Sequence, residues 1–142
     1  MTYPRPTSAL NPNATIAQLY YLLVHADGRV DDKEVEMGKK LIIVEGLNPL
    51  LFQNELTRLE NMETEGLLAE CVAVLKKLEK KVQIRYIAWM CVIANADGFM
   101  DKEEWKLIYR IYHKEMALPL DVIMEEQKTI KQQMMSKVQG AA

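Results

Sequence analysis

The sequence predicts an all-α protein, and three observations support this prediction. Hydrophobic residues recur at the three- and four-residue spacing of helices along most of the 142-residue chain, without the strict alternation of strands. Glycine and proline are scarce, at six and five residues. Almost half of the residues (49%) are hydrophobic, which is enough for a sizeable core. We expect about seven helices in a single globular bundle, formed by residues 14–142 after a flexible leader, residues 1–13.

Each expected helix is recognised by an apolar stripe, and two of them by a residue that suits a helix start. Asn48 is the predicted cap of a helix with Pro49 in its first turn, and Thr64 is the predicted cap of the next helix. After Arg85 the fifth helix is apolar almost all round, so we expect it to lie at the centre together with the first. The expected helices cover approximately residues 14–26, 32–45, 49–60, 64–78, 81–96, 102–112 and 120–135.

Composition and missing motifs exclude several classes of function. The formal net charge is −2, which predicts no general affinity for nucleic acid. No apolar run reaches the roughly 18 residues of a membrane span, and the leader lacks the apolar core of a signal peptide, so we expect a cytoplasmic protein without membrane insertion. Cys71 and Cys91 lie in apolar periodic segments and are expected to be buried thiols. Glycine-rich phosphate loops, GxSxG and HExxH are missing, which argues against an enzyme.

The chain resembles itself at an offset of 70 residues. Nine identities fall in the 39 positions from Ala17 to Glu55 when this segment is compared, without gaps, with the residues 70 positions later. The sequence therefore predicts an internal duplication with pseudo-two-fold symmetry, in halves of about residues 14–60 and 84–130. The clearest part of the repeat is an acidic bend, in which Ala26, Asp27, Gly28, Asp31 and Glu34 correspond to Ala96, Asp97, Gly98, Asp101 and Glu104.

Most of each bend is explained by the requirements of a tight connection between two helices. Gly28 and Gly98 are placed where a helix ends in a left-handed residue. Asp31 and Asp101 are placed to cap the next helix, because their carboxylates accept from exposed amide groups. Three residues later, a glutamate in each copy completes the pattern of a capping box. These features require no ligand.

Asp27 and Asp97 do not fit that structural explanation, because each follows the end of a helix, where the helix dipole disfavours negative charge. Each bend holds four carboxylates within eight residues, a density of hard oxygen ligands that suits calcium or magnesium. An EF-hand is excluded, because its first ligand position would be Leu23 or Ile93. The candidate metal ligands are Asp27, Asp31, Glu34, Asp97, Asp101 and Glu104, of which Asp27 and Asp97 are the strongest.

The paired "ADG…D..E" bends, each joining an apolar helix to an amphipathic one, resemble those of the tellurite-resistance TerB-like family and the related domain of the DnaJ-like protein DjlA. The resemblance extends from about Ala14 to Lys131. It implies an all-helical bundle with no established catalytic activity and a role in bacterial stress or tellurite-resistance systems. It also implies that the acidic residues of the bends bind divalent cations.

Two alternatives to a cation-binding module remain open at the level of the sequence. The first is a scaffold for protein–protein interaction in a stress or membrane-associated complex, in which the bends are purely structural and the methionines of the last helix contact a partner. The second is a metal-dependent hydrolase with its metal on the acidic bends. In a hydrolase, His25 beside Asp27 would be a candidate general base.

Overall fold

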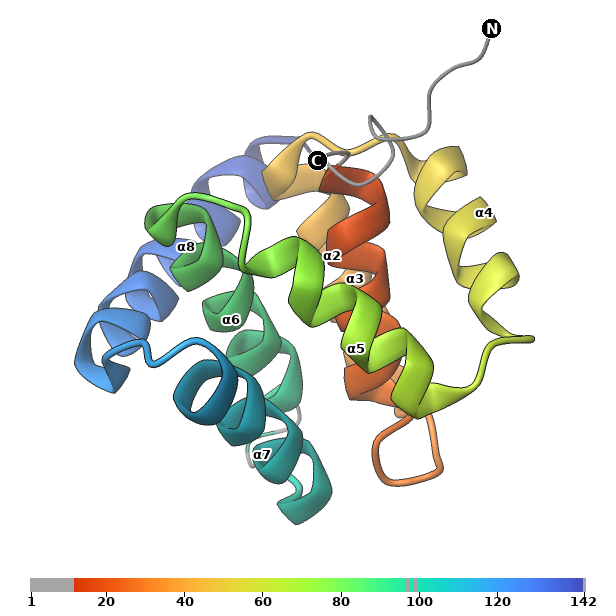
Figure 1. The fold of residues 1–142 in the computed structure, drawn as a ribbon. Helices are drawn as coiled ribbons and strands as arrows, with labels where there is room; N and C mark the ends of the chain where they lie inside the picture. The colour runs from red at the N-terminus through yellow and green to blue at the C-terminus, as the bar shows by residue number, and fades with distance from the viewer. Residues whose placement is uncertain (1–11, 97, 99, 142) are drawn as a thin grey trace, which may run out of the picture.

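The computed structural model describes residues 12–96, 98 and 100–141, and these residues form helices and no strand (Figure 1), which confirms the predicted fold class. None of the helices in this part of the chain has both the length and the apolar character needed to cross a membrane. The helices are α2 (Pro12–Val24), α3 (Asp32–Glu45), α4 (Pro49–Leu59), α5 (Thr64–Leu75), α6 (Lys80–Ala94), α7 (Lys102–Tyr109), the π-helix η1 (Arg110–Glu115) and α8 (Leu120–Ala141).

The observed helix starts agree best with the predicted ones where a short polar side chain caps the helix. The Asn48 side-chain oxygen accepts from the amides of Leu50 and Leu51 at 2.9 and 3.1 Å, as predicted. The prediction for Thr64 was wrong. Thr64 is the first residue of α5, and the side chain of Glu63 accepts from the amides two and three residues later. Glutamate is an uncommon cap, which is why the shorter threonine was preferred from the sequence.

Several other helix boundaries differ from the sequence prediction, the largest difference being the end of the last helix, at Ala141 instead of residue 135. The first helix begins at Pro12, since proline suits the first turn of a helix, and ends at Val24. The last two residues of the predicted leader, 1–13, therefore belong to α2, and its other residues lie outside the described part of the chain. The sixth predicted helix changes from α to π at Arg110, a change that apolar spacing does not reveal.

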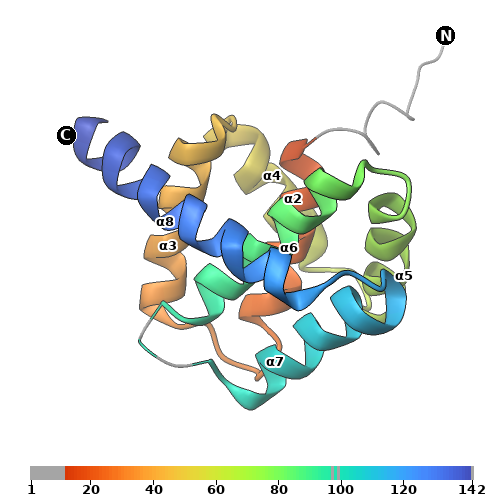
Figure 2. The same cartoon turned by 90° about the vertical axis from the view of Figure 1, so that its left-hand side faces the viewer.

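The core forms around α6 and α2, which occupy the middle of the molecule in Figures 1 and 2. All nine residues from Tyr86 to Ala94 are buried, as expected for a helix that is apolar on every side. On α2, the segment Leu22–Val24 is buried in the same way. The central position that we predicted for these two helices is thus observed.

A close contact between α2 and α3 depends on the absence of a side chain at Gly38. A Cβ atom at this position would lie 2.8 Å from Cε1 of Tyr20 and 2.9 Å from Cζ. Tyr20 is buried against Phe52, and its hydroxyl donates to the carbonyl of Glu34 at 3.4 Å. The ring therefore has little room to move, and α3 can approach α2 this closely only with glycine.

We expect Gly38→Ala to lower the free energy of unfolding by about 1–3 kcal/mol, because overpacking outweighs the better helix propensity of alanine. Urea denaturation measures the effect. Gly66→Ala is the matched control, since the new Cβ would meet only the flexible carboxylate of Glu63 at 3.2 Å. The control should be neutral or stabilised by up to roughly 1 kcal/mol. Equal changes in the two variants would contradict the proposed clash.

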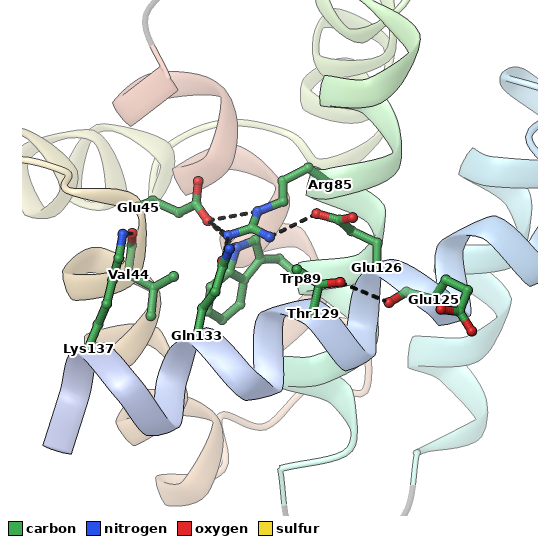
Figure 3. A network of polar contacts seen from close by, with 9 residues as sticks. All are labelled: Val44, Glu45, Arg85, Trp89, Glu125, Glu126, Thr129, Gln133 and Lys137. Atoms are coloured by element: carbon green, nitrogen blue, oxygen red, sulfur yellow. Dashed lines mark hydrogen bonds and ion pairs between the residues drawn. The ribbon is translucent and has the colours of Figure 1, made fainter.

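A polar network joins α3, α6 and α8 beside the core (Figure 3). Arg85 donates through Nε and Nη2 to one carboxylate oxygen of Glu45, at 2.9 and 2.7 Å, and through Nη1 to Glu126 at 2.8 Å. Its Nη2 also donates to Gln133. Trp89 donates its indole N–H to the same oxygen of Glu45 at 2.7 Å. The Arg85 side chain is only 18% exposed, so the network holds a largely desolvated cation between two carboxylates.

Candidate functional site

The described residues of the two acidic bends have similar local geometry. Gly28 and Gly98 both have positive φ, 85° and 104°, the conformation that glycine adopts without steric cost. Asp31 accepts from the amide of Lys33 at 2.7 Å, and Asp101 from that of Glu103 at 2.8 Å. The predicted helix caps are confirmed in both copies. This likeness agrees with the duplication, although the relation between the complete halves remains a prediction.

Asp27 has a local hydrogen bond that explains how it is tolerated after a helix. Its carboxylate accepts from the amide of Arg29 at 3.0 Å, which turns the chain into the next segment. Its counterpart Asp97 lies outside the described residues. His25 is exposed, and its Nδ1 lies 2.9 Å from the carbonyl oxygen of Tyr21, a contact that places it on its own helix.

The two bends meet at one pocket, although they are 70 residues apart in the sequence. The hollow has a volume of about 300 Å³. Six carboxyl groups and one guanidinium line it, a formal charge of −5 when every group is ionised. In Figures 1 and 2 the bend after α2 and the beginning of α7 lie at the same lower end of the molecule. The lining residues are Asp27, Arg29, Val30, Asp31, Asp32, Glu34, Asp101 and Glu104.

The pocket is built around two buried glutamates, one from each bend. Glu34 is 7% exposed and Glu104 is 2% exposed. Their carboxyl groups hydrogen-bond to each other. A direct bond between two carboxyl groups requires that at least one of them hold a proton.

Burial and mutual repulsion explain how the pair retains this proton. Burial, together with the hydrogen bond to Glu34 and its charge, raises the pKa of Glu104 to about 9. The pKa of Glu34 is also raised, mainly by burial, with further contributions from the charges of Asp31 and Asp27. Glu104 also accepts from the amide of Asp101 at 3.4 Å, which completes the predicted capping box of α7.

The chemistry of the pocket suits a hard cation. Carboxylate oxygens are the ligands that calcium and magnesium prefer, and the negative charge of the lining attracts them. Of the six predicted ligands, the structure brings together Asp27, Asp31, Glu34, Asp101 and Glu104. In the conformation seen here, no three His, Cys, Asp or Glu side chains of the described residues converge as a metal-binding group. Binding would therefore require side-chain rotation.

Sequence reasoning explained the two capping glutamates mainly by their local role, although it included them among the candidate metal ligands, and it missed their contact with each other. Asp32 and Arg29, which also line the pocket, were not among the predicted ligands. A signal was present: a glutamate occurs at the same register of each repeat, and symmetry-related positions can meet at the axis between two halves. Only the packing of α3 against its neighbours shows that Glu34 and Glu104 do meet.

Comparisons with known proteins address the family directly. No curated protein and no solved structure matches the chain significantly. The family model described as tellurite resistance protein TerB matches residues 13–114, well over half of the chain, and this match includes both acidic bends and the pocket between them. The all-helical architecture agrees with that match, and the chain therefore belongs to the TerB family.

Proposed function

We propose that this chain is a non-catalytic TerB-like module that binds one divalent cation, calcium or magnesium, between its two acidic bends. Membership of the TerB family further supports a role in a bacterial stress or tellurite-resistance system. The observation that carries the proposal is the buried Glu34–Glu104 pair, which faces a pocket lined by carboxylates of both bends. The two bends thus contribute to a single site instead of forming one site each.

The roles within this site follow from the present contacts. Glu34 and Glu104 would hold the ion, and Asp27 would supply a further oxygen on releasing the amide of Arg29. Asp31 and Asp101 stay mainly as helix caps, because their carboxylates already accept from amides of the first turn. An ion held in this way would neutralise the negative charge of the pocket and link the start of α3 to the start of α7.

The test is a thermal melt of the protein in chelator and in millimolar calcium or magnesium, together with calorimetric titration. We expect the ions to raise the melting temperature and to bind with a stoichiometry of one per chain. Asp27→Asn should leave the metal-free stability nearly unchanged, because asparagine can still accept from Arg29, and should reduce the ion-induced rise. Asp121→Asn, an exposed position at the start of α8, is the matched control.

Asp31→Ala separates capping from binding within the same bend. We expect it to cost about 0.5–2 kcal/mol of stability with or without the ion, because it removes a helix cap. A stoichiometry of two ions would contradict the shared site. A parent protein whose melt ignores both ions would leave the scaffold function, with purely structural bends, as the better account.

The hydrolase alternative finds no support in the described residues. Burial raises the pKa of Cys71 and of Cys91 to about 12, so neither thiol is a nucleophile near neutral pH. His25 is turned to its own helix and does not line the pocket. Phosphatase and nuclease screens of the ion-loaded protein provide the check, and turnover that Asp27→Asn abolishes would overturn the non-catalytic assignment.

A further inference from the structure

Helix α8 lies beyond the segment matched by the TerB family model, which ends at residue 114. A four-residue linker, Met116–Pro119, connects it to η1. In Figure 2 α8 crosses in front of α3 and α6, with its C-terminal end beyond the body of the molecule, and it packs on these two helices. We call the surface of α3 and α6 on which α8 packs the seat. It is formed by parts of the chain that precede the linker.

One face of α8 makes the contacts with the seat. Apolar and polar residues alternate along this face. Two isoleucines on this face are completely buried. Between them and after them, polar side chains bond to Arg85, and a lysine donates to the carbonyl of Val44 at 3.2 Å (Figure 3). The residues of this face are Ile123, Glu126, Ile130, Gln133 and Lys137, at the three- and four-residue spacing of one helical stripe.

The linker holds the backbone in an unfavourable conformation. Ala117 has a φ of 53°, the one positive value among the described residues other than glycine. The left-handed region disfavours alanine because Cβ approaches the carbonyl oxygen. The conformation is held by the amide of Leu118, which donates to the backbone carbonyl of Tyr112 at 2.8 Å, and by burial of the Leu118 side chain. Pro119 favours an extended backbone at Leu118.

We propose that α8 exchanges between two copies of this chain, so that each copy seats the α8 of the other. The one helix that is known to fit the seat is α8 itself, and every contact of its buried face can be made equally well by a second copy. Exchange requires α8 to leave its own copy and the linker to open, but the contacts of α8 form again on the second copy, so the two states differ mainly in the linker, where opening returns Ala117 to a common backbone region. The loss of the Leu118–Tyr112 hydrogen bond opposes opening, so the exchanged dimer is expected at high protein concentration.

A pair of charge-reversed variants tests the exchange. Arg85→Glu places like charges between the seat and its own α8, and Glu126→Arg does the same from the other side. In an exchanged heterodimer of the two variants, both contacts between positions 85 and 126 again join opposite charges. We expect each variant alone to be monomeric by size-exclusion chromatography with light scattering, and an equimolar mixture, unfolded and refolded together, to form heterodimers by native mass spectrometry. A mixture that remains monomeric would overturn the proposal.

The linker supplies an independent test that leaves the seat unchanged. Ala117→Gly removes the strain and should raise the dissociation constant of the dimer by about tenfold, while Ala117→Val increases the strain and should lower it. Sedimentation of the folded variants over a range of concentrations measures both constants. Identical dissociation constants, or the opposite order, would contradict exchange through this linker even if a dimer forms by another surface.

Discussion

Replacing Glu104 by glutamine should make the metal-free protein more stable above neutral pH and nearly remove one source of its pH dependence. The parent keeps a proton on the Glu34–Glu104 pair, because the pKa of Glu104 is raised to about 9. Glutamine preserves the shape and can donate to Glu34 without carrying a titratable proton. At pH 8 we expect the free energy of unfolding to rise by about 1–3 kcal/mol.

The sign follows from proton counting. In the unfolded chain Glu104 has its ordinary pKa of 4.5, so between this value and about 9 the folded state holds a proton that the unfolded state has released. Stability from this group is complete below the lower value and is lost as the pH rises through the window. The parent should therefore lose stability from pH 5 to pH 9 in chelator, and Glu104→Gln should lose much less.

Chemical denaturation at several pH values measures both slopes. Glu103→Gln is the matched control, because this neighbouring side chain is half exposed and pairs with Lys106 at 3.4 Å. The control should follow the parent within roughly 0.5 kcal/mol. Parallel curves for the parent and Glu104→Gln would show that the buried pair does not retain a proton.

Removing the arginine of the α3–α6–α8 network should cause the second large effect. We expect Arg85→Ala to lower the free energy of unfolding by about 2–4 kcal/mol, since Glu45 and Glu126 would remain largely desolvated without a cation. The melting temperature should fall by roughly 5–15 °C. Arg85→Lys should recover only part of the loss, because an ammonium cannot reproduce the bonds of the guanidinium fork to Glu45.

An exposed ion pair provides the comparison. Lys39 and Glu36 lie 3.1 Å apart with both side chains 65% exposed, so Lys39→Ala should cost no more than about 0.5 kcal/mol. If Arg85→Ala were as mild as this control, the network would contribute specificity of packing instead of stability. A double variant, Arg85→Ala with Glu126→Gln, should be more stable than Arg85→Ala alone, because one uncompensated charge is removed.

The sequence predicted best the features whose causes lie within a few residues. The caps at Asp31, Asn48 and Asp101 are local, since a side chain bonds to an amide two or three positions later. The fold class depends on the apolar spacing of whole helices and was equally accessible. The cap by Glu63 was not predicted, because shorter residues are usual at a helix cap. The longer side chain of Glu63 nevertheless reaches the amides two and three residues later.

The features that escaped prediction depend on packing between distant segments. Glu34 and Glu104 are 70 residues apart, and Arg85 bonds to residues 40, 41 and 48 positions away. The sequence pattern within one helix contains no information about which polar side chains of different helices will contact one another. The sequence did indicate that the acidic bends form a candidate site, but it placed most weight on Asp27 and Asp97, whereas the structure draws attention to the buried glutamates.

The different environments of the two tryptophans give the protein a pair of intrinsic fluorophores. Trp89 is completely buried with its indole bonded to Glu45, so its emission should be blue-shifted and inaccessible to iodide. Trp105 is 38% exposed, immediately after Glu104, so its emission should be red-shifted and quenched. With Trp105→Phe, the remaining signal reports release of the network beneath α8. With Trp89→Phe, the fluorescence of Trp105 reports changes beside the acidic pocket. Fluorescence of the two variants can therefore follow the two regions separately.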